Sequence, residues 1–308
     1  MSETSKRLAQ LTPDRRSLID RLMAAQRHPP APAPPSAPVP LPADRASPRD
    51  PDEVKEGQRR FFDAVTAQLN SGGYGQFSFF LNYGYASDGK PEFATVQLPE
   101  HYLNRNSVKL VLEVIGDYSV RGRRVLDVGC GRGGTIHVLT TLFEPQSVTG
   151  LDLSGAAIAF CRETHKDPRA RFIEGDAENL PFEDGEFDAV TNLESSHCYP
   201  HIHRFYAEVS RVLVPGGYFL YTDIQPVPMW TTNLGLLGHL GFTVERDRDI
   251  TSNVLQSCDQ VAGRRVGAYA GGNDSGLLNN FLATPGSQVY DEMRSGRWVY
   301  RILTLRRS

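Results

Sequence analysis

The chain has 308 residues, of which 40% are hydrophobic and 22% are charged, with a formal net charge of -3. This composition is typical of a protein with a buried core, and its slight acidity argues against nucleic acid as a bulk partner, because phosphate binding needs a broad cationic surface. The sequence has no run of about 18 apolar residues and no apolar segment at its charged N-terminus, so we expect a cytoplasmic protein without a membrane span.

The N-terminal region divides into a helix and a linker. Residues 1–27 predict one short amphipathic helix, with Thr12 as its N-cap and Pro13 at its first position. Ten prolines within 28–51 predict an extended, semi-rigid linker. The helix is therefore tethered to the rest of the chain, either as a docking element for a partner protein or as a disordered tail.

Residues 52–308 have a globular composition and are assigned to one domain. Its first part, 52–120, predicts a helical cap with helices over 52–69 and 99–118. A glycine-broken aromatic loop over 72–89 separates these two helices.

Strand and helix patterns then alternate from 121 to 225. Alternation of this kind predicts parallel strands with right-handed crossovers, and hence an α/β fold with a doubly wound sheet. The last part, 226–308, predicts a helix, a strand, an insertion over 252–296 and a final antiparallel strand, which we expect at a sheet edge carrying the insertion as a lid. The predicted strands lie within 123–130, 147–153, 170–177, 186–195, 216–224, 241–250 and 298–307, and the helices of the core within 133–143, 154–165 and 199–213.

A glycine loop follows the first of these strands in the sequence VLDVGCGRGG. Gly129, Gly131 and Gly134 satisfy the G-x-G-x-x-G pattern of dinucleotide-binding domains, which alone is weak evidence. Asp127 precedes the first glycine, and a carboxylate there repels a diphosphate but suits a ligand with an ammonium group and a sulfonium. The loop is therefore predicted to bind a nucleoside other than NAD, although a dehydrogenase remains formally open.

Further polar residues end the next strands. Asp152 lies about twenty residues beyond the loop, where a carboxylate can accept hydrogen bonds from both ribose hydroxyls. Asp176 and Ala177 follow the third strand, where a side-chain acceptor can meet an adenine amine. Residues 192–195 leave the fourth strand in the crevice where open α/β sheets bind ligands.

The pieces VLDVGCGRGG, GLDLS, GDAENLPF, FDAV and LVPGGYF, in this order over about 120–225, resemble those of class I S-adenosylmethionine-dependent methyltransferases. The resemblance implies a Rossmann-like, seven-stranded sheet and S-adenosylmethionine as cofactor. It places 121–225 as the cofactor-binding core and 226–308 as the substrate-side insertion and last strands. The cofactor-binding residues it implies are Asp127 and Gly129 near the methionine part, Gly131 near the nucleoside, Asp152 on the ribose, Asp176 near adenine, and also Cys130, Leu153, Ala177, Asn192, Leu193 and Tyr83.

Histidines after the fourth strand are the candidate bases. A hydroxyl acceptor is a poor nucleophile until its proton leaves, and histidine can accept that proton near neutral pH. His197 is favoured because it lies closest to the strand, with His201 as a second candidate at the start of the next helix and His203 as a surface residue. Glu194 is expected to orient the site or to touch the methionine part of the cofactor. The alternative for His197 is a hydrogen-bonded wall residue under the loop.

A metal is not expected in this site. The four cysteines lie far apart without a CxxC pair, which predicts reduced structural thiols rather than a metal cluster. Asp223, close to the predicted site, leaves room for a metal ion.

A narrower resemblance concerns the acceptor. The stretches ESSHCYPHIHRFYAEVSRVLVPGGYFLYTD and FFLNYGY are similar to methyltransferases acting on lipids and polyketides, such as the fatty-acid O-methyltransferases and phthiotriolone methyltransferases. This implies O-methylation of a hydroxyl or carboxyl of a hydrophobic small molecule in secondary metabolism. The stretch LAQLTPDRRSLIDRLM resembles the helix that precedes modules of polyketide and nonribosomal peptide synthases, which implies such a synthase as a partner. C- or N-methylation, a methyltransferase-like cyclase and a non-catalytic assembly-line component are the alternatives.

Overall fold

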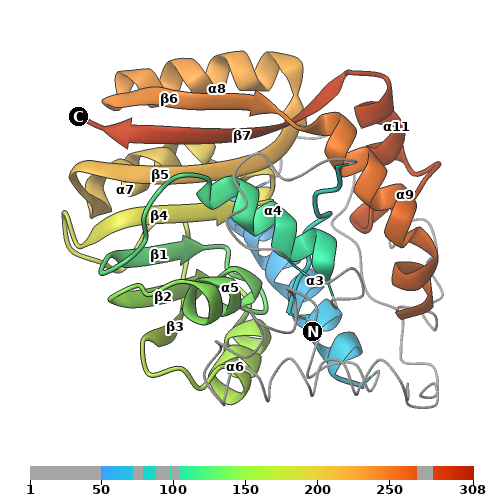
Figure 1. The fold of residues 1–308 in the computed structure, drawn as a ribbon, viewed down its shortest axis with the longest axis horizontal. Coiled ribbons are helices and arrows are strands. Elements are labelled where there is room, and N and C mark those ends of the chain that lie inside the picture. The colour runs from blue at the N-terminus through green and yellow to red at the C-terminus, as the bar shows by residue number, and fades with distance from the viewer. Residues whose placement is uncertain (1–49, 72–78, 88–97, 99–103, 269–279) are drawn as a thin grey trace, which may run out of the picture.

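The protein is built on one seven-stranded sheet with the strand order β3-β2-β1-β4-β5-β7-β6 (Figure 1). The computed structural model describes residues 50–71, 79–87, 98, 104–268 and 280–308. Neighbouring strands from β3 to β5 run parallel, whereas β7 runs antiparallel to both β5 and β6. The strands are β1 Arg124–Val128, β2 Ser147–Asp152, β3 Ala170–Glu174, β4 Phe187–Leu193, β5 Leu213–Pro226, β6 Phe242–Asp249 and β7 Trp298–Arg307.

Helices cover both faces of the sheet, as expected for a doubly wound fold. In Figure 1, α4 and α5 lie in front of the sheet, and α7 and α8 lie behind it. Side chains of β1 alternate between these layers, since Leu126 and Val128 pack in one core cluster and Val125 in the other. The helices of the core and its cap are α4 Arg105–Ile115, α5 Gly134–Leu142, α6 Gly155–Thr164, α7 Ile202–Val212 and α8 Val227–His239.

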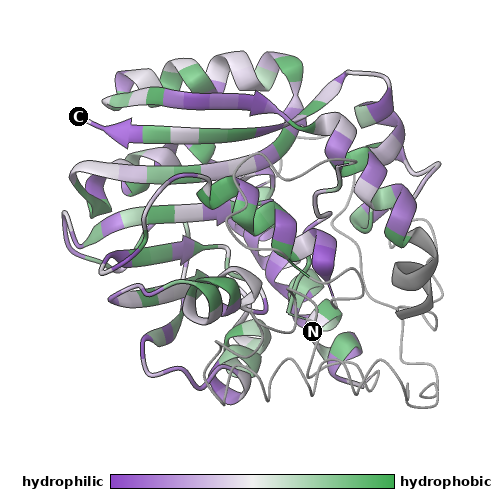
Figure 2. Ribbon diagram, viewed as in Figure 1, coloured by the Kyte–Doolittle hydropathy of each residue, from purple (hydrophilic) through white to green (hydrophobic). Residues whose placement is uncertain are grey.

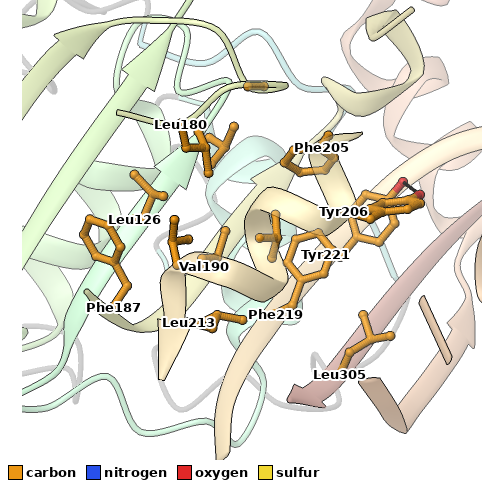
Figure 3. Packing of buried hydrophobic residues seen from close by; sticks show 14 of the residues in the cluster. Leu126, Leu180, Phe187, Val190, Phe205, Tyr206, Leu213, Phe219, Tyr221 and Leu305 are labelled. Carbon is orange, nitrogen blue, oxygen red and sulfur yellow. Dashed lines mark hydrogen bonds between the residues drawn. The ribbon is translucent and has the colours of Figure 1, made fainter. Parts of the chain in front are cut away.

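The cluster behind the sheet is rich in aromatic rings. Figure 3 shows Phe205 and Tyr206 of α7 packed over Phe219 and Tyr221 of β5. The Phe219 and Tyr221 rings stack with centroids 4.9 Å apart, and both side chains are fully buried. This packing fixes β5 against α7 just below the site that the next subsection describes.

The final strand is antiparallel, as predicted, but its predicted place at a sheet edge is wrong. β7 lies between β5 and β6, and its side chains at Tyr300, Ile302, Leu303 and Leu305 are fully buried in the core clusters on the two faces of the sheet, as is typical of an interior strand. β6 forms the edge instead, and its second half, Glu245–Asp249, is charged, as Figure 2 shows in purple. Charged side chains of this kind protect an exposed edge from pairing with other chains.

The cap is built from helices at both ends of the domain. Helix α3, Pro51–Ser71, confirms the predicted helix over 52–69, and it packs through Phe61, Val65 and Leu69 against Leu282 of the C-terminal insertion. Helices α9, Thr251–Ala268, and α11, Gln288–Arg294, belong to that insertion and lie at the right of Figure 1.

Several predicted elements lie partly or wholly outside the described residues. The helix over 1–27 and nearly all of the linker over 28–51 do so, as do parts of the aromatic loop and of the insertion. Within the part of the chain that is described, no helix combines the length and apolar character needed to cross a bilayer.

Candidate active site

The glycine loop after β1 is a tight turn pressed against the turn after β4. Gly129 and Gly131 adopt φ values of 70° and 51°, a region that favours glycine. The backbone N–H groups of Gly129 and Cys130 both donate to the Leu151 carbonyl oxygen, at 2.8 and 3.0 Å. A Cβ atom on Gly129 would lie 2.2 Å from the Ser195 hydroxyl, so no larger residue fits there without movement.

Asp127 lies at the end of β1 and is 1% exposed. Its Oδ1 accepts a 2.6 Å hydrogen bond from the Thr191 hydroxyl, whereas its Oδ2 is buried without a hydrogen-bond partner among the described residues. Burial raises the pKa of this carboxyl to about 7, and the Thr191 hydrogen bond opposes the rise. Among the described residues, no cationic side chain bonds to this carboxyl oxygen.

Asn192 presents a second acceptor of this kind. Its Nδ2 donates to the Val128 carbonyl oxygen at 2.9 Å and to the Ser195 hydroxyl at 2.7 Å. These bonds fix the amide orientation, because the carbonyl can only accept. The Asn192 Oδ1 is then left buried with no partner in the described part of the chain. Two orphaned acceptors on neighbouring strands suit a ligand that carries an ammonium group.

Asp152 ends β2 and faces the glycine loop. Its Oδ2 accepts from the Gly131 N–H at 2.8 Å, and its Oδ1 accepts from the Ser154 N–H at 2.9 Å. The residue is half-buried, and burial raises its pKa. Each carboxylate oxygen can accept one more hydrogen bond, so the pair of hydroxyls expected from a ribose can still bind. Leu153, next in the chain, is half-buried.

Asp176 is held by a residue that the sequence reading missed. Its Oδ2 lies 2.7 Å from Nζ of Lys55 in α3, and the same ammonium lies 2.6 Å from Oε2 of Glu178. Burial lowers the pKa of Lys55, but its hydrogen bonds to the two carboxylates outweigh this and raise the pKa. Ala177 between them is buried. These ion pairs therefore hold helix α3 against the position predicted for adenine.

His197 and Asp223 form a hydrogen-bonded pair. Nδ1 of His197 lies 2.7 Å from Oδ1 of Asp223, and the His197 backbone N–H donates to Oδ2 at 2.9 Å. The Asp223 side chain is fully buried, whereas that of His197 is 30% exposed. Burial lowers the pKa of His197, but Cys198 and Asp223 outweigh it and raise the pKa well above its usual value. The short helix Ser196–Cys198 carries the histidine to the carboxyl edge of the sheet.

His201 lies on a different carboxylate. Its backbone N–H donates to Oε1 of Glu178 at 2.6 Å, and its Nδ1 lies 3.3 Å from Oε2. It is the N-cap residue of α7, close to the predicted helix start, and His203 beside it is exposed, as expected.

Glu194 ties the aromatic segment to the sheet. It follows Leu193, the last residue of β4, and has a φ of 50°, which is uncommon for a residue with a side chain. Its Oε1 and Oε2 accept from the Tyr83 N–H at 2.8 and 3.0 Å, and Oε1 also accepts from the Tyr300 hydroxyl. Glu194 therefore holds Tyr83 next to β7.

Comparison with known proteins places this geometry in a family. Residues 126–221 match the family described as "Methyltransferase domain". A fatty-acid O-methyltransferase of Mycolicibacterium smegmatis is 39% identical over 233 residues, which are 72% of this chain and 81% of that protein. The chain belongs to the S-adenosylmethionine-dependent methyltransferases. A phthiotriol/phenolphthiotriol dimycocerosates methyltransferase of Mycobacterium tuberculosis is 34% identical over 241 residues, or 72% of this methyltransferase and 83% of the other.

Solved structures agree on the fold. The methyltransferase superposes on the [4+2]-cyclase SpnF with a TM-score of 0.62 at 23% identity, covering 88% of this chain and 99% of that one. A geranyl diphosphate methyltransferase solved with geranyl diphosphate and sinefungin gives a TM-score of 0.60 at 21% identity, covering 83% and 100%. At sequence identities this low, the similarity shows that the fold is shared and does not show which reaction is catalysed.

S-adenosylmethionine is the cofactor, and the residues present fit it. The orphaned oxygens of Asp127 and Asn192 suit its ammonium group, and the side-chain-free turn at Gly129 and Gly131 allows close approach of a ligand. No group of three or more metal-binding side chains gathers within the described ranges.

Asp223 is the site residue whose role the sequence could have revealed. A lone acid in the strand sequence YFLYTDI lies in the strand that pairs with β4, and it ends beside the candidate histidine. Lys55 and Tyr300 gave no comparable signal, because they reach the site from elements remote in sequence.

Proposed function

We propose that this methyltransferase transfers a methyl group from S-adenosylmethionine to a hydroxyl of a hydrophobic, lipid-like or polyketide acceptor, with His197 as the base. The observation that carries the proposal is the 2.7 Å contact between His197 Nδ1 and the buried Asp223 carboxylate at the carboxyl edge of the sheet. The two relatives are named for lipids, a fatty acid and phthiotriol dimycocerosates, which supports a hydrophobic acceptor in secondary metabolism.

The cofactor supplies an electrophilic methyl group on a sulfonium sulfur, so the protein's tasks are to bind, to orient and to take a proton. In this proposal Asp127 and Asn192 hold the methionine end, with Leu193 and Cys130 beside them. Asp152 holds the ribose and Asp176 the adenine, with Leu153 and Ala177 as apolar neighbours. Tyr83 borders the cofactor from the aromatic segment that Glu194 anchors.

The dyad suits a hydroxyl acceptor. Asp223 can only accept, so it holds the His197 proton at Nδ1, and in this proposal the proton of the acceptor hydroxyl goes to Nε2. Because the pKa of His197 is raised, turnover should rise as the pH increases through that pKa and the histidine loses its proton. A carboxyl acceptor is already ionised and needs no base, so it should lack this dependence.

The test is product analysis with a panel of acceptors: a long-chain diol, a phenolic polyketide and a long-chain fatty acid. O-methylation gives a product heavier by one methylene, which fragmentation locates on oxygen, whereas a C- or N-methylated product or an isomer would contradict the proposal. His197→Gln should lower turnover on the hydroxyl acceptors by about 100-fold or more. The matched control is His203→Gln, since His203 is exposed and should leave turnover unchanged.

A second part of the proposal takes a polyketide or nonribosomal peptide synthase as the partner, and it rests only on the sequence resemblance of residues 1–27, whose predicted helix lies outside the described residues. Deleting residues 1–50 should then weaken binding to such a synthase but spare methylation of a free acceptor. Unchanged synthase binding would remove this part alone.

A further inference from the structure

Asp223 is a fully buried carboxylate whose oxygens are all engaged. Its Oδ1 accepts from His197 Nδ1 and from the Ile224 N–H, each at 2.7 Å. Its Oδ2 accepts from the His197 N–H at 2.9 Å and from the Ser196 hydroxyl. A buried charge is retained only when hydrogen bonds replace its water, so each of these donors affects how strongly Asp223 attracts His197.

The Ser196 hydroxyl is itself the end of a longer chain of hydrogen bonds. Its Oγ lies 2.6 Å from the Tyr221 hydroxyl, which also lies 2.9 Å from Nε2 of Gln225. The Oε1 of Gln225 accepts from Asn233 Nδ2 of α8 at 2.6 Å. The side chains of all four residues in this hydrogen-bonded series are buried.

Chemistry fixes the direction of every bond in this chain. Asp223 only accepts, so Ser196 gives it its single proton and must accept from Tyr221. Tyr221 has then used its own proton and accepts from Gln225 and from Tyr206, whose hydroxyl lies 3.1 Å away (Figure 3). The Asn233 Oδ1, at the far end, is buried without a partner in the described structure, so the chain starts there.

We propose that Ser196 and Tyr221 are positioning residues of the methyl transfer, acting in series on the Asp223 carboxylate to moderate how strongly it attracts the proton of His197. The proposal rests on the function proposed above, in which His197 is the base. Because donors in a row polarise one another, the Tyr221 hydroxyl strengthens the bond that Ser196 gives to Asp223. Through this bond to Asp223, the two residues neutralise part of the carboxylate charge that attracts the His197 proton. They therefore set the basicity of His197.

Few other titratable groups act on this pair. Cys198 beside His197 raises the pKa of the histidine together with Asp223. Tyr206 of α7, Tyr221 of β5 and Tyr300 of β7 feel the charge of Asp223, and burial raises the pKa of each hydroxyl, so all three stay neutral near pH 7. Within this neighbourhood the relay through Ser196 is the only set of uncharged side-chain donors that the described residues bring onto Asp223.

The test measures the titration of His197 by NMR in the full-length protein, with its signal assigned from His197→Gln. Ser196→Ala removes one hydrogen-bond donor from Asp223, so the carboxylate attracts the His197 proton more strongly. The midpoint of the His197 titration should therefore rise by about one pH unit. Tyr221→Phe should raise it by less. The double variant should match Ser196→Ala alone, because Tyr221 acts only through Ser196. Thr222→Val is the matched control, since that buried hydroxyl donates to the Arg301 carbonyl oxygen on another path, and its midpoint should not move.

An unmoved or lowered midpoint in Ser196→Ala, or shifts that add in the double variant, would overturn the relay. This readout needs no turnover, so it is separate from the proposed function. If His197→Gln kept full methyl transfer while the shifts appeared as expected, the base would be wrong and the relay would stand as a property of the pair.

Discussion

Asp127 should make cofactor binding depend on pH. Burial raises the pKa of its carboxyl to about 7, so near neutrality the free protein holds this group about half protonated. An ammonium group binds only the ionised form, and protons therefore compete with the ligand below that pKa. Binding at about pH 6 should be roughly tenfold weaker than at about pH 8, and it should release a proton at the lower pH.

Calorimetry with S-adenosylhomocysteine, in buffers that differ in ionisation enthalpy, measures both the affinity and the proton released. Asp127→Asn keeps the shape of the side chain but loses a hydrogen bond to a charged group. It should therefore bind roughly 10- to 100-fold more weakly at about pH 8, with an affinity that no longer changes with pH. If the variant kept the pH dependence of the native chain, another group such as Asp152 would be responsible and this reasoning would be refuted.

Three further substitutions test other parts of the site. Gly129→Ala places a Cβ atom 2.2 Å from the Ser195 hydroxyl in a residue with a φ of 70°. The melting temperature should therefore fall by roughly 4 °C or more. An unchanged melting temperature would contradict the close approach of the two turns. Lys55→Met leaves the buried Glu178 carboxylate without its ammonium, so urea unfolding should show a free energy of unfolding lower by about 1–3 kcal/mol. The control Arg60→Met, on the exposed side of α3, should lower it by less than about 0.5 kcal/mol. Equal losses would show that the Lys55 ion pairs do not hold α3 in place. Asp223→Asn should lower kcat by about 100-fold or more with an unchanged circular dichroism spectrum, and native turnover would remove the dyad from the mechanism.

Local patterns in the sequence predicted the core of the fold. Each β-rich run between 121 and 225 became a strand, and the polar residues at the carboxyl ends of β1, β2, β3 and β4 came together because parallel strands share one carboxyl edge. The order of the last two strands was missed although the signal was present. The apolar run WVYRILTL in β7 is typical of an interior strand that is buried on both faces, whereas the charged run VERDRD in β6 is typical of an edge strand.

Contacts between remote segments were beyond local patterns. Lys55 reaches Asp176 across 121 positions, and Tyr300 reaches Glu194 across 106. Neither lysine nor tyrosine at those places differs from an ordinary helix or strand residue until the cap and the sheet are assembled. The position of Asp223 near the site follows from its strand, which pairs with β4, but the exact contact with His197 depends on the short helix after β4.

The most direct test of the mechanism is kcat/KM for a hydroxyl acceptor as a function of pH, in the native chain and in His197→Gln. The pKa of His197 is raised, so the native value should climb tenfold per pH unit below that pKa and level off once the histidine is deprotonated. The variant should be at least about 100-fold slower at the plateau and lack that rise. Two superimposable profiles would show that His197 takes no proton and would contradict the account.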